Sequence, residues 1–242
     1  MAQIGFKTDK GKKRDRNEDS LFVLPREGVY IVADGVGGQN SGELASMMAV
    51  KSIAEYIKER PLYGIEDEAE IKEYYLGCMH SVNRIIYDMA KQSNENAGMA
   101  TTVVILHLIG NYAYIVNVGD SRAYICRDLS IRQITEDHTY VNELLKGGSI
   151  TKAQAEYHPN KNMITRALGG DIVILPDFYR LETHKNDIII LCTDGLYGEL
   201  STEEINCMAR KSNAMCELSR DLVQRANQKG GNDNITVICL KI

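Results

Sequence analysis

Residues 29–38 read V-Y-I-V-A-D-G-V-G-G, a short run of β-forming residues that ends in Asp34 and continues into a glycine-rich turn. Glycine permits a tight turn and a close approach of backbone carbonyl groups. A strand that delivers a carboxylate into such a turn places a hard oxygen ligand beside carbonyl oxygens. The stretch therefore predicts a strand whose end carries a metal ligand.

Three further acids stand at the ends of apolar runs. Residues 112–120 close on Asp120, residues 188–194 close on Asp194, and Asp233 immediately precedes the last apolar run, residues 234–242. One such acid is usually a turn aspartate. Together with Asp34 they form a set of strand-end carboxylates that indicates a convergent metal site.

The composition is that of a soluble globular protein, with 44% hydrophobic and 25% charged residues among 242. A net charge of −5 argues against a nucleic-acid partner, because phosphate binding favours a basic face. No apolar stretch approaches the ~20 residues of a membrane span, and the first residues lack the apolar segment of a signal peptide. We expect a cytoplasmic protein with no membrane partner.

The six cysteines show no C-x-x-C pairing, and Cys192 and Cys239 fall inside apolar runs. Cysteines used in this way are typical of reduced core residues in a cytosolic protein. We therefore expect all six to be reduced core residues.

Hydrophobic periodicity divides the chain into the strands and helices of one domain, residues 1–242. The predicted strands are residues 3–8, 21–24, 29–33, 101–109, 112–118, 122–126, 131–135, 172–181, 188–193 and 235–242. The predicted helices are residues 41–60, 66–92, 139–146, 151–157, 202–211 and 215–229.

Two of these helices have a predicted buried stripe. The stripes are Leu44, Met48, Ile53, Tyr56 and Ile57 in the first helix, and Ile71, Tyr75, Cys78, Val82, Ile85 and Met89 in the second.

The pair Gly110-Asn111 predicts a hairpin with a two-residue turn, and residues 122–126 and 131–135 are expected to continue it as a meander. Successive hairpins without crossover helices predict an antiparallel sheet. Nucleotide-binding motifs are excluded, because Asn40 stands where G-x-G-x-x-G requires glycine and no G-x-x-x-x-G-K-[ST] occurs.

All the candidate ligands carry oxygen, and the five histidines form no H-x-x-H or H-E-x-x-H pattern that would recruit zinc. Oxygen-only sites suit Mg²⁺ or Mn²⁺. A carboxylate shared by two such ions, about 3.5–4 Å apart, holds a water between them and lowers its pKa. Asp34 is the best candidate for this bridge, with the Gly35 carbonyl on one ion and Asp194 and Asp233 on the other.

Arg14, Glu18 and Asp19 precede the second predicted strand, and a cation four residues before an acid pair is unusual there. The segment is either a charged turn or an arginine fork for a phosphate group beside carboxylates that orient metal-bound water. From these residues alone both interpretations stay open.

A series of short motifs extends over nearly the whole length: R-D-R-N-E-D-S (14–20), V-A-D-G-V-G-G with S-G-E-L-A-S (32–46), G-M-A-T-T-V-V (98–104), V-G-D-S-R-A (118–123), E-D-H-T (136–139), N-M-I-T-R-A-L-G (162–169), C-T-D-G-L (192–196) and N-D-N-I-T-V (232–237). In this order the series resembles the motifs of the bacterial type 2C metal-dependent protein serine/threonine phosphatases, the PPM family. Each motif alone is weak evidence, whereas the ordered series is specific.

The resemblance implies an α+β fold, a four-layer α-β-β-α sandwich of two antiparallel sheets face to face with helices outside. It implies two Mn²⁺ or Mg²⁺ ions between the sheets. Asp34 is then the bridging ligand, Gly35 supplies a carbonyl, and Asp194 and Asp233 bind the second ion.

The same resemblance makes Arg14 the residue that holds the substrate phosphate, with Glu18 and Asp19 acting on the metal largely through water. Asp120 resembles the acid that helps to bind a third, weaker ion, although a turn cap is an equally good interpretation of it. Residues 138–170 correspond to a flap beside the active site. The implied partners are phosphorylated proteins and an opposing serine/threonine kinase, and a monomer is expected.

Two positions depart from the family. Val36 stands where many members carry a histidine that acts as general acid, so the proton for the leaving group is expected from a metal-bound water or another group, with His138 a weak candidate. Gly198 stands where many members carry an acid, so the third ion is expected to bind more weakly. Two rival functions stay open: a catalytically silent binding module, and a dinuclear hydrolase of small phosphoesters.

Three further residues have a structural interpretation. Thr101 and Thr102 are expected to be plain strand residues, and His107 a satisfied core histidine.

Overall fold

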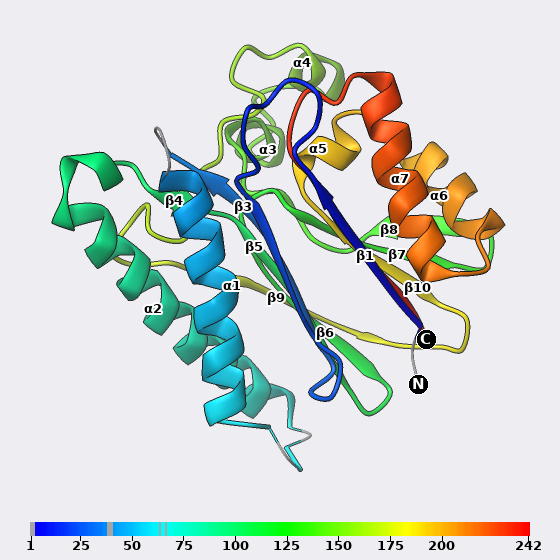
Figure 1. Cartoon of the computed structure of the whole chain (residues 1–242), viewed down its shortest axis with the longest axis horizontal. Helices are drawn as coiled ribbons and strands as arrows, with labels where there is room; N and C mark the ends of the chain where they lie inside the picture. Colours follow the sequence, from blue (N-terminus) through cyan, green and yellow to red (C-terminus); the bar gives the residue numbers. More distant parts are fainter. Residues whose placement is uncertain (1–2, 38–40, 63, 66) are drawn as a thin grey trace.

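The computed structural model describes residues 3–37, 41–62, 64–65 and 67–242. Two antiparallel sheets lie face to face, and helices cover their outer faces (Figure 1). The predicted four-layer α-β-β-α sandwich of the α+β class is therefore confirmed.

One sheet has the strand order β2-β3-β5-β6-β9, with the short β4 beside β3, and the other has the order β1-β11-β10-β7-β8. The strands are β1 (Gln3–Asp9), β2 (Asp19–Leu24), β3 (Val29–Val36), β4 (Ala100–Thr101), β5 (Val103–Ile109), β6 (Tyr112–Val118), β7 (Arg122–Arg127), β8 (Ser130–Gln133), β9 (Asp177–Glu182), β10 (Ile188–Cys192) and β11 (Ile235–Lys241). The helices are α1 (Ser41–Glu59), α2 (Glu68–Gln92), the 3₁₀ turn η1 (Asn94–Asn96), α3 (Tyr140–Lys146), α4 (Lys152–Glu156), α5 (Asp194–Tyr197), α6 (Thr202–Lys211) and α7 (Met215–Lys229).

The side chains of β3 alternate between two hydrophobic layers, as the two-residue period of a strand requires. Ile31 and Ala33 pack with α1 and α2 on the outer face, whereas Tyr30 and Val32 pack against the other sheet. A third layer lies between the second sheet and helices α5, α6 and α7. Both faces of each sheet are thus covered, and the ends of the central strands remain available for polar residues.

The meander prediction was wrong. Strand β6 pairs with β5 and β9, whereas β7 pairs with β8 and β10 in the other sheet. The hairpin signal is local, but the choice of partner strand depends on contacts far along the sequence. The chain crosses between the sheets at residues 119–121, so Asp120 lies at the boundary between them.

The buried face of α2 is also displaced from the predicted one. Ile85 is 46% exposed and Met89 is only partly buried, whereas Met79 and Ile86 are fully buried. Apolar residues that alternate four and three apart follow a period of 3.5, and a straight helix has 3.6 residues per turn. The predicted stripe therefore drifts off the buried face toward the C-terminal end of this long helix.

In α1 the contact with the sheet is made by small side chains. Ala45 and Ala49 are fully buried, whereas Leu44, Met48 and Tyr56 of the predicted stripe are only partly buried. The small residues allow the helix to lie close to β2 and β3.

Several smaller expectations need correction. The strand predicted at residues 172–181 begins only at Asp177, and Ile172 and Val173 are exposed. Cys207 and Cys216 are exposed, although all six cysteines are free thiols. Gly38, Asn40 and Glu66, which belong to predicted features, lie outside the described residues. In the described part of the chain, no helix is long and apolar enough to cross a membrane.

Gly5 in β1 provides a test of the sheet–helix contact. A Cβ atom at this position would overlap the backbone of Met215 at the start of α7, so Gly5→Ala must displace that helix. We expect the free energy of unfolding to fall by about 1–3 kcal/mol, measured by urea denaturation. Gly77→Ala is the matched control, because its Cβ would meet only the Tyr56 hydroxyl at 3.1 Å and alanine favours a helix. Equal effects of the two substitutions would contradict this packing.

Candidate metal centre

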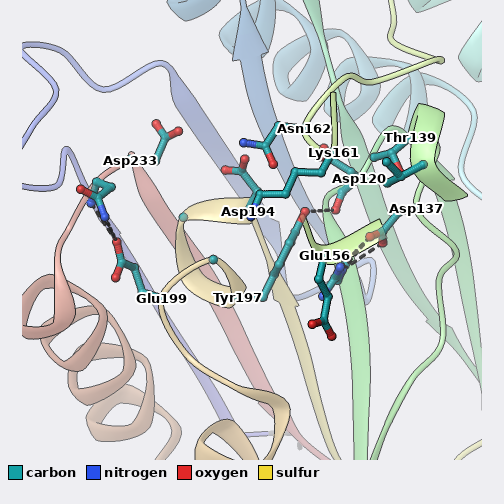
Figure 2. Close-up of a pocket in the computed structure, with 15 residues that line it drawn as sticks. Asp120, Asp137, Thr139, Glu156, Lys161, Asn162, Asp194, Tyr197, Glu199 and Asp233 are labelled. Atoms are coloured by element: carbon teal, nitrogen blue, oxygen red, sulfur yellow. Dashed lines mark hydrogen bonds and ion pairs between the residues drawn. The ribbon is translucent and has the colours of Figure 1, made fainter. Parts of the chain in front are cut away.

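The acids gather around a cavity of about 280 Å³ at one end of the sandwich, between the two sheets. The structure brings to this cavity every predicted site residue except Asp19: Arg14, Glu18, Asp34, Gly35, Asp120, Asp194 and Asp233. Asp19 lies directly beside Asp34 in the β2–β3 register and is buried. A second cavity of about 670 Å³ adjoins the first and shares Asp120, Asp194 and Asp233 with it (Figure 2).

Asp34 lies within β3 and not at its end, because the strand continues to Val36. Its backbone N–H donates to the Thr102 hydroxyl at 3.0 Å, and its carbonyl accepts the Thr101 hydroxyl at 2.8 Å. The expectation that these two threonines are plain strand residues was therefore wrong. Their hydroxyl groups fix the backbone on both sides of the Asp34 side chain.

Gly35 allows three segments to meet beside Asp34. Its N–H donates to the Glu18 carbonyl at 3.1 Å, and a Cβ atom would overlap the carbonyl of Gly42 in the first turn of α1. A Cβ at Gly42 would in turn lie 3.0 Å from the Glu18 carboxylate. The two glycines thus place the start of α1 against Glu18 and β3.

Asp19 is held by a hydrogen bond that joins the two sheets. The Thr193 hydroxyl donates to Asp19 Oδ2 at 2.8 Å and accepts the Thr236 N–H at 3.0 Å. Asp19 Oδ1 is buried and has no hydrogen-bond partner among the described residues. Burial raises the pKa of the Asp19 carboxyl to about 7, against the hydrogen bonds from Thr236 and Thr193.

Asp194 and Asp233 come from the second sheet. Asp194 is the first residue of α5, directly after β10, and Asp233 lies just before β11. A Cβ atom at Gly195 would overlap the Asn234 carbonyl, so the two segments are in close contact. Asp233 Oδ2 accepts a hydrogen bond from the Arg14 guanidinium at 2.7 Å, which brings the predicted phosphate-binding arginine into the site.

Asn234 is a residue that the sequence analysis did not single out. Its amide nitrogen donates to the carbonyls of Lys10 (3.0 Å) and Arg16 (2.7 Å), and its oxygen accepts the Glu18 N–H at 2.8 Å. One side chain therefore shapes the loop that carries Arg14 and Glu18. An asparagine between Asp233 and a buried strand was the only available signal.

Asp120 lies in the turn that crosses between the sheets. The Tyr197 hydroxyl donates to its carbonyl at 2.9 Å (Figure 2), and the neighbouring Ser121 hydroxyl bonds Thr102 at 2.8 Å. Burial raises the pKa of the Asp120 carboxyl to about 7, and repulsion from Asp194 adds to the effect. The side chain lines both cavities.

The carboxylates are crowded and short of positive charge. Burial, followed by repulsion from neighbouring carboxylates, raises the pKa of Asp34 well above its usual range and that of Asp194 to about 6. Asp194 Oδ1, like Asp19 Oδ1, is a buried oxygen without a partner among the described residues. Unpartnered carboxylate oxygens that face repulsion are what a divalent cation would satisfy. The residues present therefore fit Mg²⁺ or Mn²⁺.

Within the described residues, no three acidic, histidine or cysteine side chains form a ready-made cage around one ion. A cage is not required for the ions in question, because Mg²⁺ is commonly bound by one or two carboxylates and keeps several waters. The spacing of the acids around a cavity suits such a hydrated site.

The two departures from the family have structural counterparts. The Glu199 carboxylate accepts the backbone N–H (3.1 Å) and the amide (2.7 Å) of Asn232, away from Asp120 (Figure 2), so it does not replace an acid at Gly198. His138 is buried and does not line either cavity. The hypothesis that His138 acts as general acid was therefore wrong.

Comparison with known proteins supplies independent evidence. The family model described as protein phosphatase 2C matches residues 9–237. The chain is 35% identical to the serine/threonine phosphatase stp of Listeria welshimeri over 239 residues, which is 98% of this chain and 94% of that protein.

Solved structures agree. The S. agalactiae serine/threonine phosphatase has a TM-score of 0.91 and 32% identity, and the match covers 100% of both chains. The catalytic domain of PstP, described as a complex with 2 manganese ions, has a TM-score of 0.86 and 30% identity over 99% of this chain and 97% of that chain.

The raised pKa of Asp19 predicts that the free energy of unfolding of the metal-free protein depends on pH. The pKa of Asp19 is about 7 in the folded state and about 3.9 in the unfolded state, so the folded state binds more protons between about pH 3.9 and pH 7. The contribution of Asp19 to the free energy of unfolding therefore falls as the pH rises through this range. Asp19→Asn should therefore stabilise the metal-free protein increasingly from pH 5 to pH 7, by up to about 1.4 kcal/mol per pH unit, with no further gain above about pH 7.

The measurement is the free energy of unfolding in urea at several pH values with a chelator present. Asp88→Asn on the exposed face of α2 serves as the control, with a change of under about 0.5 kcal/mol at every pH. If the difference in unfolding free energy between Asp19→Asn and wild type did not vary with pH, the pKa of Asp19 would not be raised in the folded protein.

Proposed function

Because the chain belongs to the protein phosphatase 2C family, we propose that the carboxylates around the smaller cavity hold two divalent ions at the catalytic centre. The protein is a metal-dependent protein serine/threonine phosphatase, a phosphoric monoester hydrolase that acts on phosphoserine and phosphothreonine in proteins. Its catalysis depends on Mn²⁺ or Mg²⁺. The single observation that carries the proposed residue roles is the convergence of Asp34, Asp194 and Asp233, from opposite sheets, on one cavity.

In the proposed arrangement Asp34 would be a ligand of both ions, the Gly35 carbonyl would help to hold one of them, and Asp194 and Asp233 would hold the other. Asp34 is suited to the shared position because it lies on the cavity with its backbone fixed by Thr101 and Thr102. When bound, the ions supply an activated water and stabilise the charge on the phosphoryl group.

Arg14 binds the substrate phosphate. Its side chain is 50% exposed at the cavity, and Asp233 accepts from one nitrogen of the guanidinium, which leaves further N–H groups for phosphate oxygens. The pKa of Arg14 is raised, mainly by the hydrogen bond to Asp233, so the group stays charged. Glu18 and Asp19 act on the ions through ordered water, consistent with their places beside and behind Asp34.

A third, weaker ion binds at Asp120 and Asp194. The two carboxylates line both cavities, and the turn of Glu199 toward Asn232 leaves this position with one ligand fewer. Val36, which is 41% exposed at the cavity, cannot donate a proton. Because neither Val36 nor His138 is placed to donate a proton, water in the cavity, including water on a bound ion, would protonate the leaving serine or threonine oxygen.

Residues 1–242 form one catalytic domain with a flap subdomain at residues 138–170. Helices α3 and α4 of this segment lie at the site end of the sandwich (Figure 1), and Asn162 and Ile164 line the metal cavity. The protein acts as a monomer in the cytoplasm and opposes a serine/threonine kinase that phosphorylates the same proteins. The names of its relatives, which are serine/threonine and protein phosphatases, agree with a role in protein dephosphorylation.

Asp34→Asn and Asp194→Asn test the metal roles. Each is expected to lower kcat/KM for a phosphothreonine peptide in the presence of Mn²⁺ at least about a hundredfold, because a neutral amide holds the ions poorly. Far-ultraviolet circular dichroism should remain that of the wild type. Asp88→Asn is the control with full activity, and near-wild-type turnover in either site variant would overturn the assigned roles.

Two further arms separate the alternatives. Arg14→Lys should raise KM more than it lowers kcat, since lysine keeps the charge but not the planar fork.

Calorimetric titration with Mn²⁺ distinguishes a silent binding module, which would bind the ion without turnover. Faster hydrolysis of nucleotides than of the phosphopeptide would favour a small-phosphoester hydrolase.

The kinase relationship has its own test. Deleting this protein from its host should raise phosphoserine and phosphothreonine occupancy at sites that a single kinase modifies, measured by comparing phosphoproteomes. Complementation with Asp34→Asn should fail to reverse the rise. Unchanged occupancy throughout would contradict the proposed opposition.

A further inference from the structure

His138 stands at the start of the flap, and both nitrogens of its buried ring have partners. Nδ1 lies 3.0 Å from the backbone nitrogen of Gly119, and Nε2 lies 3.1 Å from Asp177 Oδ2. The side chain is 4% exposed. A buried ring with two specific partners has a defined orientation and a defined tautomer.

The partners determine that tautomer. A backbone nitrogen can only donate, so Nδ1 accepts the Gly119 N–H and carries no proton. Nε2 then bears the proton and donates to the Asp177 carboxylate. Arg166, 3.2 Å from Nε2, can also only donate, and its nitrogen is satisfied by Asp177 Oδ1 at 3.1 Å. Burial lowers the pKa of His138, which agrees with a neutral ring.

The accepted N–H belongs to the turn that carries Asp120. Gly119 has φ +103°, and its carbonyl accepts the His138 N–H at 3.0 Å and the Asn117 amide at 3.2 Å. A Cβ atom at Gly119 would lie 2.6 Å from the Thr102 side chain, the same residue whose hydroxyl accepts from Asp34. The turn is therefore held between His138 on one side and Thr102 on the other.

The opposite edge of the ring is connected to the end of the flap. Asp177 begins β9, and Arg166 lies in the returning flap segment, where it also donates to the Leu175 carbonyl at 3.3 Å. The His138 carbonyl accepts the Thr165 N–H at 2.8 Å. The two ends of the flap thus meet at one imidazole ring.

We propose that His138 is a positioning residue: its Nδ1 holds the Gly119 N–H and so fixes the Asp120 carboxylate, while Asp177 sets the required tautomer and links the flap to that turn. The metal part of this inference rests on the proposed role of Asp120 in binding a third ion. Its structural part, the tautomer and the clamped turn, does not depend on any bound ion.

The tautomer can be measured directly. In wild-type protein the ¹⁵N chemical shifts of His138, from two-bond proton–nitrogen correlation spectra, should show an unprotonated Nδ1 and a protonated Nε2. The Gly119 amide should exchange slowly with solvent. A protonated Nδ1 would overturn the proposal whatever the activity of the protein.

Two variants separate the functions of the two nitrogens. In His138→Asn the amide oxygen occupies roughly the place of Nδ1 and can still accept the Gly119 N–H, whereas His138→Gln places its amide near Nε2 and leaves that N–H unpaired. His138→Gln should weaken the weakest class of Mn²⁺ sites about tenfold in calorimetric titration, and His138→Asn by much less. Gly119 amide protection should be lost only in His138→Gln.

The same substitutions in an Asp120→Asn background test whether His138 acts through Asp120. There His138→Gln should add no more than about a twofold change in Mn²⁺ affinity, because residues that act as a unit are not additive. Lys146→Gln is the matched control, since Lys146 lies on α3 of the flap and pairs at 2.7 Å with the exposed side chain of Glu136. It should change neither readout.

Two results would overturn the inference: identical behaviour of His138→Asn and His138→Gln, or a full His138→Gln effect in the Asp120→Asn background. Circular dichroism identifies a variant that fails to fold, and the wild-type tautomer and Gly119 exchange then decide the question. Failure of the proposed function is a separate outcome. Wild-type protein without a third class of Mn²⁺ sites would remove the role of Asp120, and Gly119 protection in the two variants would still confirm or refute the clamped turn.

Discussion

The structure depends on holding several carboxylates close together where water is scarce. Such a group is costly in isolation, since burial and mutual repulsion both favour protonation, and the pKa values of Asp19, Asp34, Asp120 and Asp194 are all raised. Two sheets packed face to face make the arrangement possible, because each contributes acids from strand ends while the core between them remains apolar. Divalent cations bound at the proposed centre would offset the repulsion between these acids, which would couple metal affinity to the rigidity of the fold.

That rigidity comes from a few polar side chains that join segments distant in sequence. Thr102 connects the backbone of Asp34 to Ser121 beside Asp120, and Thr193 connects β11 to the Asp19 carboxylate. Asn234 connects the start of β11 to the loop that carries Arg14. Each is a hydroxyl or amide with two or more partners, so its removal would leave buried donors or acceptors unsatisfied. The carboxylates are thus positioned by hydroxyl and amide groups of neighbouring segments.

The site acids and many of the helices and strands could be predicted from the sequence, because their signals are patterns of neighbouring residues. The bounds of α6 and α7 were predicted correctly, and Ser201 with Glu204 forms a capping box before α6. What could not be predicted depends on distant contacts. The chain crosses from one sheet to the other at Gly119 because β7 pairs with β10. Asn234 forms its hydrogen bonds with a loop more than two hundred residues away in the sequence. No window of neighbouring residues carries that information.

Adjacent positions in a turn or helix are not equivalent, and Glu199 illustrates the reason. Glu199 lies in the turn that follows α5, one position after Gly198, and its side chain points in another direction. Its carboxylate instead accepts two hydrogen bonds from Asn232, in the turn that leads into Asp233. A Cβ atom at Gly230 would lie 2.7 Å from the same carboxylate, so glycine there permits the contact. The chain therefore has one candidate metal ligand fewer near Asp120, and the Glu199 hydrogen bonds hold the turn next to Asp233. Both features favour the two ions proposed at Asp34 over a third ion at Asp120.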